Sequence, residues 1–358
     1  MTNAPNRRSV GATLGRASAV IALVLVLIVV WYTRDVMLLA FAGVLLAVCL
    51  RTPARWLHSR VGIPTGLALA LVVLLPVGAT VALFWVRGPE IARELDALRE
   101  GVPQAAAAVE ARLQRSEWGR RVVEELPTFE QALPDARSAI SGATGVVSRT
   151  FSVLTTFAIV LFLGIAFAAT PQPYVAGLLA LVPVGKVRRA RNVLQRMEAT
   201  LWWWMVGRVL SMVVVTVSTF IGLWLLDIPL AFTLAFIAGL LTFIPNVGPI
   251  LAAVPAVLLA LAQSPRLALY VVLLYAGVQT VESYIIAPVV DRKTVALPPA
   301  LTVIAQLVLV MVSGIIGAAL AAPLAAVVVV LVTMLYVHDV LERRDVGPAS
   351  SDTPALPA

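Results

Sequence analysis

Long apolar runs, each almost free of charge, dominate this sequence and limit what the chain can fold into. They lie at about residues 17–32, 36–50, 66–86, 147–169, 207–226, 230–262, 267–287 and 300–337. A helix that crosses the hydrocarbon core of a bilayer needs roughly 20 mostly apolar residues. Only 13% of the 358 residues are charged, against roughly 25% in soluble proteins. The sequence therefore predicts an all-α integral membrane protein whose first partner is the lipid bilayer.

Two of these runs are too long for single untilted spans, and both are interrupted. The interrupting residues are Pro245, Gly248 and Pro249 in the run at 230–262, and Gly314, Gly317 and Pro323 in the run at 300–337. Proline removes a backbone donor and opposes helix continuation. We therefore expect about six full transmembrane helices plus two broken or hairpin segments. The alternative for either hairpin is one tilted span.

The basic residues, which give a net charge of +8, sit in short loops beside the apolar runs. They form five groups, at 7–16, 51–60, 186–196, 292–293 and 343–344. Clusters of this kind mark the cytoplasmic side of membrane proteins, and they do not form the basic soluble domain that nucleic-acid binding requires. We predict a protein of the bacterial inner membrane with both termini cytoplasmic, and no nucleic-acid partner.

The polar and apolar stretches divide the chain into five expected regions. These are three N-terminal spans at 1–87, an extracytoplasmic helical insertion at 88–146, a fourth span with a basic amphipathic linker at 147–206, a core with two broken hairpins at 207–340, and a disordered cytoplasmic tail at 341–358. The insertion carries Ile91, Leu95, Leu98 and Val102 at helical spacing. A solvated linker is the alternative for this insertion.

Three aromatic residues, Trp202, Trp203 and Trp204, follow the basic linker. Tryptophans collect at membrane interfaces, where one side of the ring is apolar and the other polar. We expect an interfacial anchor here; a substrate-binding aromatic cluster is the alternative.

Glu282 is the candidate functional residue with the strongest physical argument. It lies in the run at 267–287, with Gln279 three positions before it on the same helix face. A carboxylate within a membrane span is costly and by default marks a functional site. The alternative to a functional role is that Glu282 lies near the cytoplasmic interface and pairs with Arg292 or Lys293. Arg208, which opens the fifth span, can pair with Glu282, neutralise an anionic solute, or extend to the interface.

Three uncharged polar residues complete the candidate path for a solute: Asn246, Gln306 and Ser313. Interrupted helices place helix ends and free carbonyls near the middle of the membrane, where they can bind ions or polar groups. Asn246 can offer its amide to a solute or cap the broken helix. Gln306 can join the path or bond a neighbouring helix.

Four stretches after residue 200 carry a resemblance to a known family. They are residues 239–249 (GLLTFIPNVGP), residues 278–284 (VQTVESY) with Pro288, residues 297–301 (LPPAL), and residues 317–324 (GAALAAPL). In this order and spacing they resemble the autoinducer-2 exporter family of bacterial and archaeal membrane proteins. The resemblance implies a multi-span, homo-oligomeric transporter. Some members look like exporters of autoinducer-2, and others like antiporters of Na⁺ or Li⁺ and H⁺.

Enzyme signatures are missing from the sequence. It has no phosphate-binding GxxxxGK[ST] loop, no zinc-binding HExxH pair and no GxSxG nucleophile turn. We predict no catalytic residues, metal site or cofactor. The prediction is a transporter that exports a small polar solute or signalling molecule and is driven by a gradient. The alternatives are a Na⁺(Li⁺)/H⁺ antiporter and an oligomeric channel-like or scaffold protein.

Overall fold

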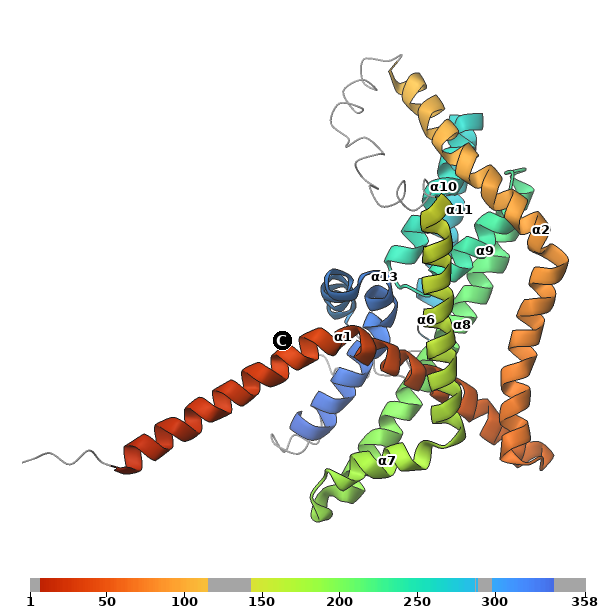
Figure 1. The fold of residues 1–358 in the computed structure, drawn as a ribbon. Helices are drawn as coiled ribbons and strands as arrows, with labels where there is room; N and C mark the ends of the chain where they lie inside the picture. Colours follow the sequence, from red (N-terminus) through yellow and green to blue (C-terminus); the bar gives the residue numbers. More distant parts are fainter. Residues whose placement is uncertain (1–6, 115–142, 287, 289–297, 338–358) are drawn as a thin grey trace, which may run out of the picture.

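The computed structural model describes residues 7–114, 143–286, 288 and 298–337, and these are helical or short connections without a strand (Figure 1). Five helices are long and apolar enough to cross a membrane, or six if the bent pair of α6 and α7 counts as one span. The described chain is thus an all-α integral membrane protein. The expected tail at 341–358 lies outside the described residues.

The first two apolar runs do not form separate spans. They lie on one continuous helix, α1 (Arg7–Val61), of which Trp31–Val61 is the candidate membrane span. The residues between the runs, 33–35, include neither glycine nor proline, so nothing in the backbone ends the helix. A helix of 55 residues is about 80 Å long. Its first half projects away from the other helices (Figure 1).

The second long helix, α2 (Thr65–Leu113), carries the chain from a span at Thr65–Ala82 into the expected insertion. The predicted helical stripe is only partly buried, because Ile91 and Leu98 are covered while Leu95 is 40% exposed. Glu94 accepts a hydrogen bond from Thr233 of α9 (Ala231–Leu241). The first part of the insertion is therefore a helix that packs on the core, and residues 115–142 lie outside the description.

The run expected as the fourth span forms α6 (Ala143–Ala169), which packs along α1. A Cβ on Gly164 would lie 2.9 Å from the Cβ of Leu46, so the two helices approach closely because the glycine has no side chain. A sharp bend of 80° leads into α7 (Pro171–Ala180). After the short 3₁₀ helix η1 (Val184–Lys186), helix α8 (Val187–Leu225) joins the basic linker and the fifth span without interruption.

The remaining elements form two helical hairpins and the span between them. The first hairpin consists of α9 (Ala231–Leu241), a break at 242–246, and α10 (Val247–Gln263). Helix α11 (Pro265–Val281) follows and continues as a π-helical turn, η2 (Glu282–Ile286). The second hairpin is α13 (Pro299–Leu331), which loses helical geometry at Ser313 and Gly314 and ends in η3 (Val332–Val337).

Two apolar clusters hold these helices together. One joins α2 to the first hairpin and its neighbours through Leu98, Leu223, Leu234 and Val271. The other joins α1, α8 and the second hairpin through Leu38, Leu45, Leu201, Trp204 and Leu320. The second cluster borders the break of the first hairpin, because Phe243 packs against it.

Candidate functional site

The break of the first hairpin is a tight reversal of the backbone. Asn246 has φ +64° and ψ −45°, and a positive φ is uncommon outside glycine. A Cβ on Gly248 would overlap the carbonyl oxygen of Leu241 and lie 2.5 Å from its carbonyl carbon. The ends of α9 and α10 can meet this closely only because residue 248 has no side chain. The last carbonyls of α9, those of Leu240 and Leu241, accept from the amides of Phe243 and Ile244 in a tighter turn, at 3.2 and 2.9 Å.

The second break has the same construction. Gly314 has φ +61°, and a Cβ on Gly317 would lie 2.7 Å from the carbonyl carbon of Leu309. In a straight helix, residues eight positions apart are about 12 Å apart along the axis, so α13 folds back on itself. Pro249 and Pro323 are not at the breaks. Pro249 lies in the first turn of α10, and Pro323 lies inside the second limb of α13, where the helix continues.

Glu282 lies against the first break and is largely buried. Its side chain is 11% exposed, and that of Arg208 is 18% exposed. Nη1 of Arg208 lies 3.3 Å from Oε1 of Glu282, and Nε2 of Gln279 donates to the other carboxylate oxygen at 3.2 Å. The same Nη1 donates to the carbonyl oxygen of Thr242 at 3.3 Å. The cluster therefore ties α8, α11 and the hairpin tip together.

An aromatic pair completes the contact between α8 and this tip. Trp204 lies one turn before Arg208, with the guanidinium 5.8 Å from its ring centre. Its ring meets Phe243 edge to face, with centroids 5.8 Å apart. Trp204 is only 9% exposed, so at least this member of the tryptophan trio is packed inside the protein rather than at an interface.

Gln306, in the first limb of α13, reaches the same break from the other side. Its Nε2 donates to the carbonyl oxygen of Pro245 at 2.7 Å, and its side-chain oxygen is buried without a hydrogen-bond partner in the described structure. A carbonyl can only accept, so the amide nitrogen must face Pro245 and the oxygen must face away. That oxygen is an unused acceptor next to the hairpin tip.

Two of the predicted polar residues lie apart from this cluster. Asn246 is exposed beside the tip, and the structure gives no hydrogen bond to cap the helix with its side chain. Ser313 donates to Asp35 of α1 at 2.7 Å, at the second break. The structure thus gathers Glu282, Gln279, Arg208 and Gln306 around the first tip. The expected alternatives Arg292 and Lys293 lie outside the described residues.

Sequence reasoning missed the contributions of Thr242 and Asp35, and it expected Trp204 at an interface rather than beside Arg208. Thr242 acts through its backbone carbonyl, and the residue type does not predict that this carbonyl accepts a side-chain hydrogen bond. For Trp204 there was a signal, since it stands four positions before Arg208 and so shares its helix face. Asp35 was also visible as an acid between two apolar runs.

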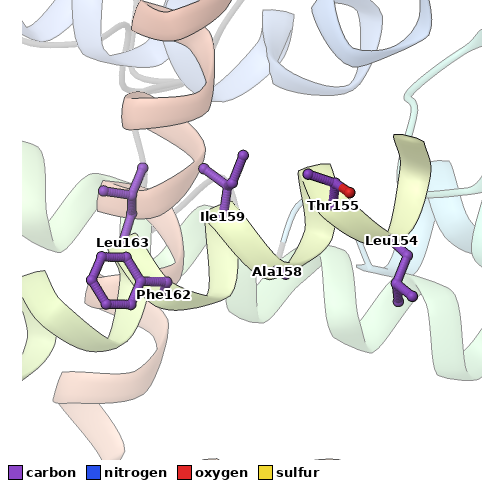
Figure 2. A pocket seen from close by; sticks show the side chains of 6 residues that line it. All are labelled: Leu154, Thr155, Ala158, Ile159, Phe162 and Leu163. Carbon is purple, nitrogen blue, oxygen red and sulfur yellow. The ribbon is translucent and has the colours of Figure 1, made fainter. Parts of the chain in front are cut away.

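An open groove on α6 is a poor candidate for a polar solute. Its lining side chains are Leu154, Thr155, Ala158, Ile159, Phe162 and Leu163, all from one helix (Figure 2). Thr155 alone among them has a polar group. A surface of this kind suits lipid chains, and it does not include the polar cluster at the hairpin tip.

Comparison with known proteins agrees with this architecture. A family model described as AI-2E family transporter matches residues 20–336. YueF of Bacillus subtilis (strain 168) is 26% identical over 281 residues, which cover 74% of this chain and 75% of that protein. MT0215 of Mycobacterium tuberculosis is 26% identical over 336 residues, which cover 90% and 89%. Both are named "Putative transport protein". Because the family match extends over most of its length, the chain belongs to the AI-2E transporter family and is a multi-pass membrane protein.

Proposed function

We propose that this chain exports a small polar solute along a path that passes the tip of the first hairpin. The observation that carries the proposal is the buried pair of Glu282 and Arg208 against the Thr242 carbonyl. Charged side chains within membrane helices are costly and face the protein interior or a polar path. Here they surround a broken helix, which is a recurring place for solute binding in transporters.

The groups around the tip suit a solute with hydroxyl groups. Gln306 supplies an acceptor without a partner, and Gln279 supplies an amide beside the carboxylate. Such a solute can exchange hydrogen bonds with these groups without a net change of charge. Autoinducer-2 is one molecule of this class. The driving force is a gradient of the solute or of a coupled ion.

A second candidate is Na⁺ or Li⁺ exchange for H⁺. The observation in its favour is Glu282 itself, the one acid that is buried among the described residues. A cation at this carboxylate would compete with the guanidinium of Arg208, 3.3 Å away. Because the pair is already neutral overall, we place exchange second to solute export.

We further propose that the protein lies in the bacterial inner membrane, with the basic segments at 51–60 and 186–196 and the C-terminus on the cytoplasmic side. Arg55 pairs with Glu198, so these two segments lie on one side. The continuous α1 gives no reversal between residues 7 and 61, so a cytoplasmic N-terminus requires its own test by labelling of introduced cysteines. The exposed Leu25, Ile28 and Val29 on the projecting half of α1 support a homo-oligomer.

Flux in proteoliposomes tests both functions. One set of vesicles is loaded with autoinducer-2 or a related hydroxylated solute, and another carries a pH dye with an imposed pH gradient, with and without Na⁺. We expect wild-type solute efflux that falls at least tenfold in Glu282→Gln, and normal efflux in the control Glu100→Gln on the exposed side of α2. Dissipation of the pH gradient that needs Na⁺ and Glu282, without solute efflux, would instead establish the antiporter.

A further inference from the structure

Helix α7 is oriented unlike the spans that precede and follow it. It makes an angle of 80° with α6 across the single residue Thr170. If α6 crosses the membrane, α7 must run nearly parallel to the plane of the membrane. Its ten residues are about 15 Å long. The turn is held by an edge-to-face contact of Phe167 with Tyr174, with centroids 4.7 Å apart.

The surface of α7 and of the turn that follows it is strongly apolar. Leu178, Leu181 and Val184 are 55%, 83% and 93% exposed. A helix that lies in the interface buries its apolar residues at the boundary of headgroups and acyl chains. The described part of the chain provides no cover for these side chains, whereas a bilayer parallel to α7 would cover them.

Basic residues follow this apolar surface directly. Lys186, Arg188, Arg191 and Arg196 are exposed, and no ion pair to them is found among the described residues. No acid occurs between residues 171 and 197. Arg188 and Arg191 are on the side of α8 opposite the buried Val193, Leu201 and Trp204. The charges are thus held outward at the level of the in-plane helix.

We propose that α7, η1 and the first two turns of α8 form a binding surface for anionic phospholipids of one leaflet. The apolar side chains enter the acyl boundary, and the basic side chains contact the phosphates. Anionic headgroups are the occupant that matches both features, since a neutral leaflet would leave several like charges close together without counter-charge.

The first test locates Leu181 in the bilayer. A Leu181→Cys substitution in a Cys49→Ser background accepts an environment-sensitive fluorophore, and vesicles carry lipids with a nitroxide just below the headgroup. We expect strong quenching by these lipids and little by aqueous iodide. Quenching by iodide alone would place the segment in water and overturn the proposal.

The second test measures the preference for phosphatidylglycerol over phosphatidylcholine by spin-label or fluorescent-lipid competition on the full-length protein. The triple change Lys186→Gln, Arg188→Gln and Arg191→Gln should lower that preference by roughly 100-fold, from about fivefold for each surface charge. The control is Arg93→Gln, Arg99→Gln and Arg266→Gln, which removes the same charge from exposed sites outside this surface. Equal preference in the wild type and the first triple variant, or an equal loss in the control, would refute the proposal. Unchanged thermal stability of both variants in phosphatidylcholine confirms that they are folded.

Discussion

Replacement of Gly248 by alanine tests whether the first break depends on direct backbone contact. The new Cβ would overlap the carbonyl oxygen of Leu241 and lie 2.5 Å from its carbonyl carbon and 3.1 Å from the amide nitrogen of Thr242. Unbonded carbon atoms prefer roughly 3.5–4.0 Å, so the overlap is about 1 Å. These obstructing atoms belong to the backbone and cannot rotate away, as a flexible side chain could.

The loss of folding free energy in Gly248→Ala depends on which atoms must move to make room for the new Cβ. Extra atoms in a packed core destabilise by about 1–3 kcal/mol, and a backbone obstacle places this change near 3 kcal/mol. Separation of α9 from α10 would also move the Thr242 carbonyl away from Arg208, 3.3 Å distant in the wild type. We therefore expect lower stability and lower flux together.

Gly277→Ala is the matched control. Gly277 lies within α11, and a Cβ there would meet nothing within 4 Å. Alanine stabilises a helix interior by about 1 kcal/mol relative to glycine. Thermal unfolding in one detergent and solute efflux from proteoliposomes should separate the two variants, with Gly248→Ala below the wild type in both. If the two alanine variants behaved alike, the close contact of α9 and α10 would not hold the break, and the reasoning would fail.

Three further predictions concern the polar cluster and the second break. Removal of either Arg208 or Glu282 should destabilise the protein by about 3–5 kcal/mol, because the other charge stays buried without its partner. The double variant Arg208→Met and Glu282→Met should recover much of this stability but should not transport, and a double-mutant cycle of unfolding free energies measures the recovery. Gln306→Leu should cost about 1–3 kcal/mol, because the Pro245 carbonyl loses its donor, and should reduce solute efflux; unaltered efflux would remove Gln306 from the path. Gly317→Ala should lower thermal stability as Gly248→Ala does, and a neutral result would argue against a folded-back α13.

The positions of the two breaks could be predicted from the sequence because the responsible constraints are local. Pro245 lacks an N–H, and glycine at 248 and 314 permits close approach or positive φ; each property belongs to the residue itself. The continuity of α1 could not be predicted in the same way. Arg34 and Asp35 interrupt the apolar pattern, but charge does not end a helix, and hydropathy alone cannot distinguish a turn from a polar stretch of helix.

The site was predicted only in part, for a different physical reason. Glu282 and Gln279 are three positions apart, so their shared face follows from helix geometry. Arg208 and Glu282 are 74 positions apart, and their contact depends on how α8 packs against α11. The third partner, the carbonyl of Thr242, becomes available only because the chain reverses there. Side-chain identity predicts neither the packing nor the freed carbonyl.

One hydrogen bond between the two hairpins sets the depth at which the tip of the first hairpin lies. Gln306 lies seven residues from Pro299 and seven from Ser313, halfway along the first limb of α13, or about 10 Å from either end. Its bond to Pro245 therefore holds the tip of the first hairpin at that depth. Backbone groups and charges at such depth require protein partners or water, and the side-chain oxygen of Gln306 has no protein partner in the described structure. A solute or water that binds there would satisfy this acceptor, so occupancy of the tip is expected to stabilise the contact between the two hairpins.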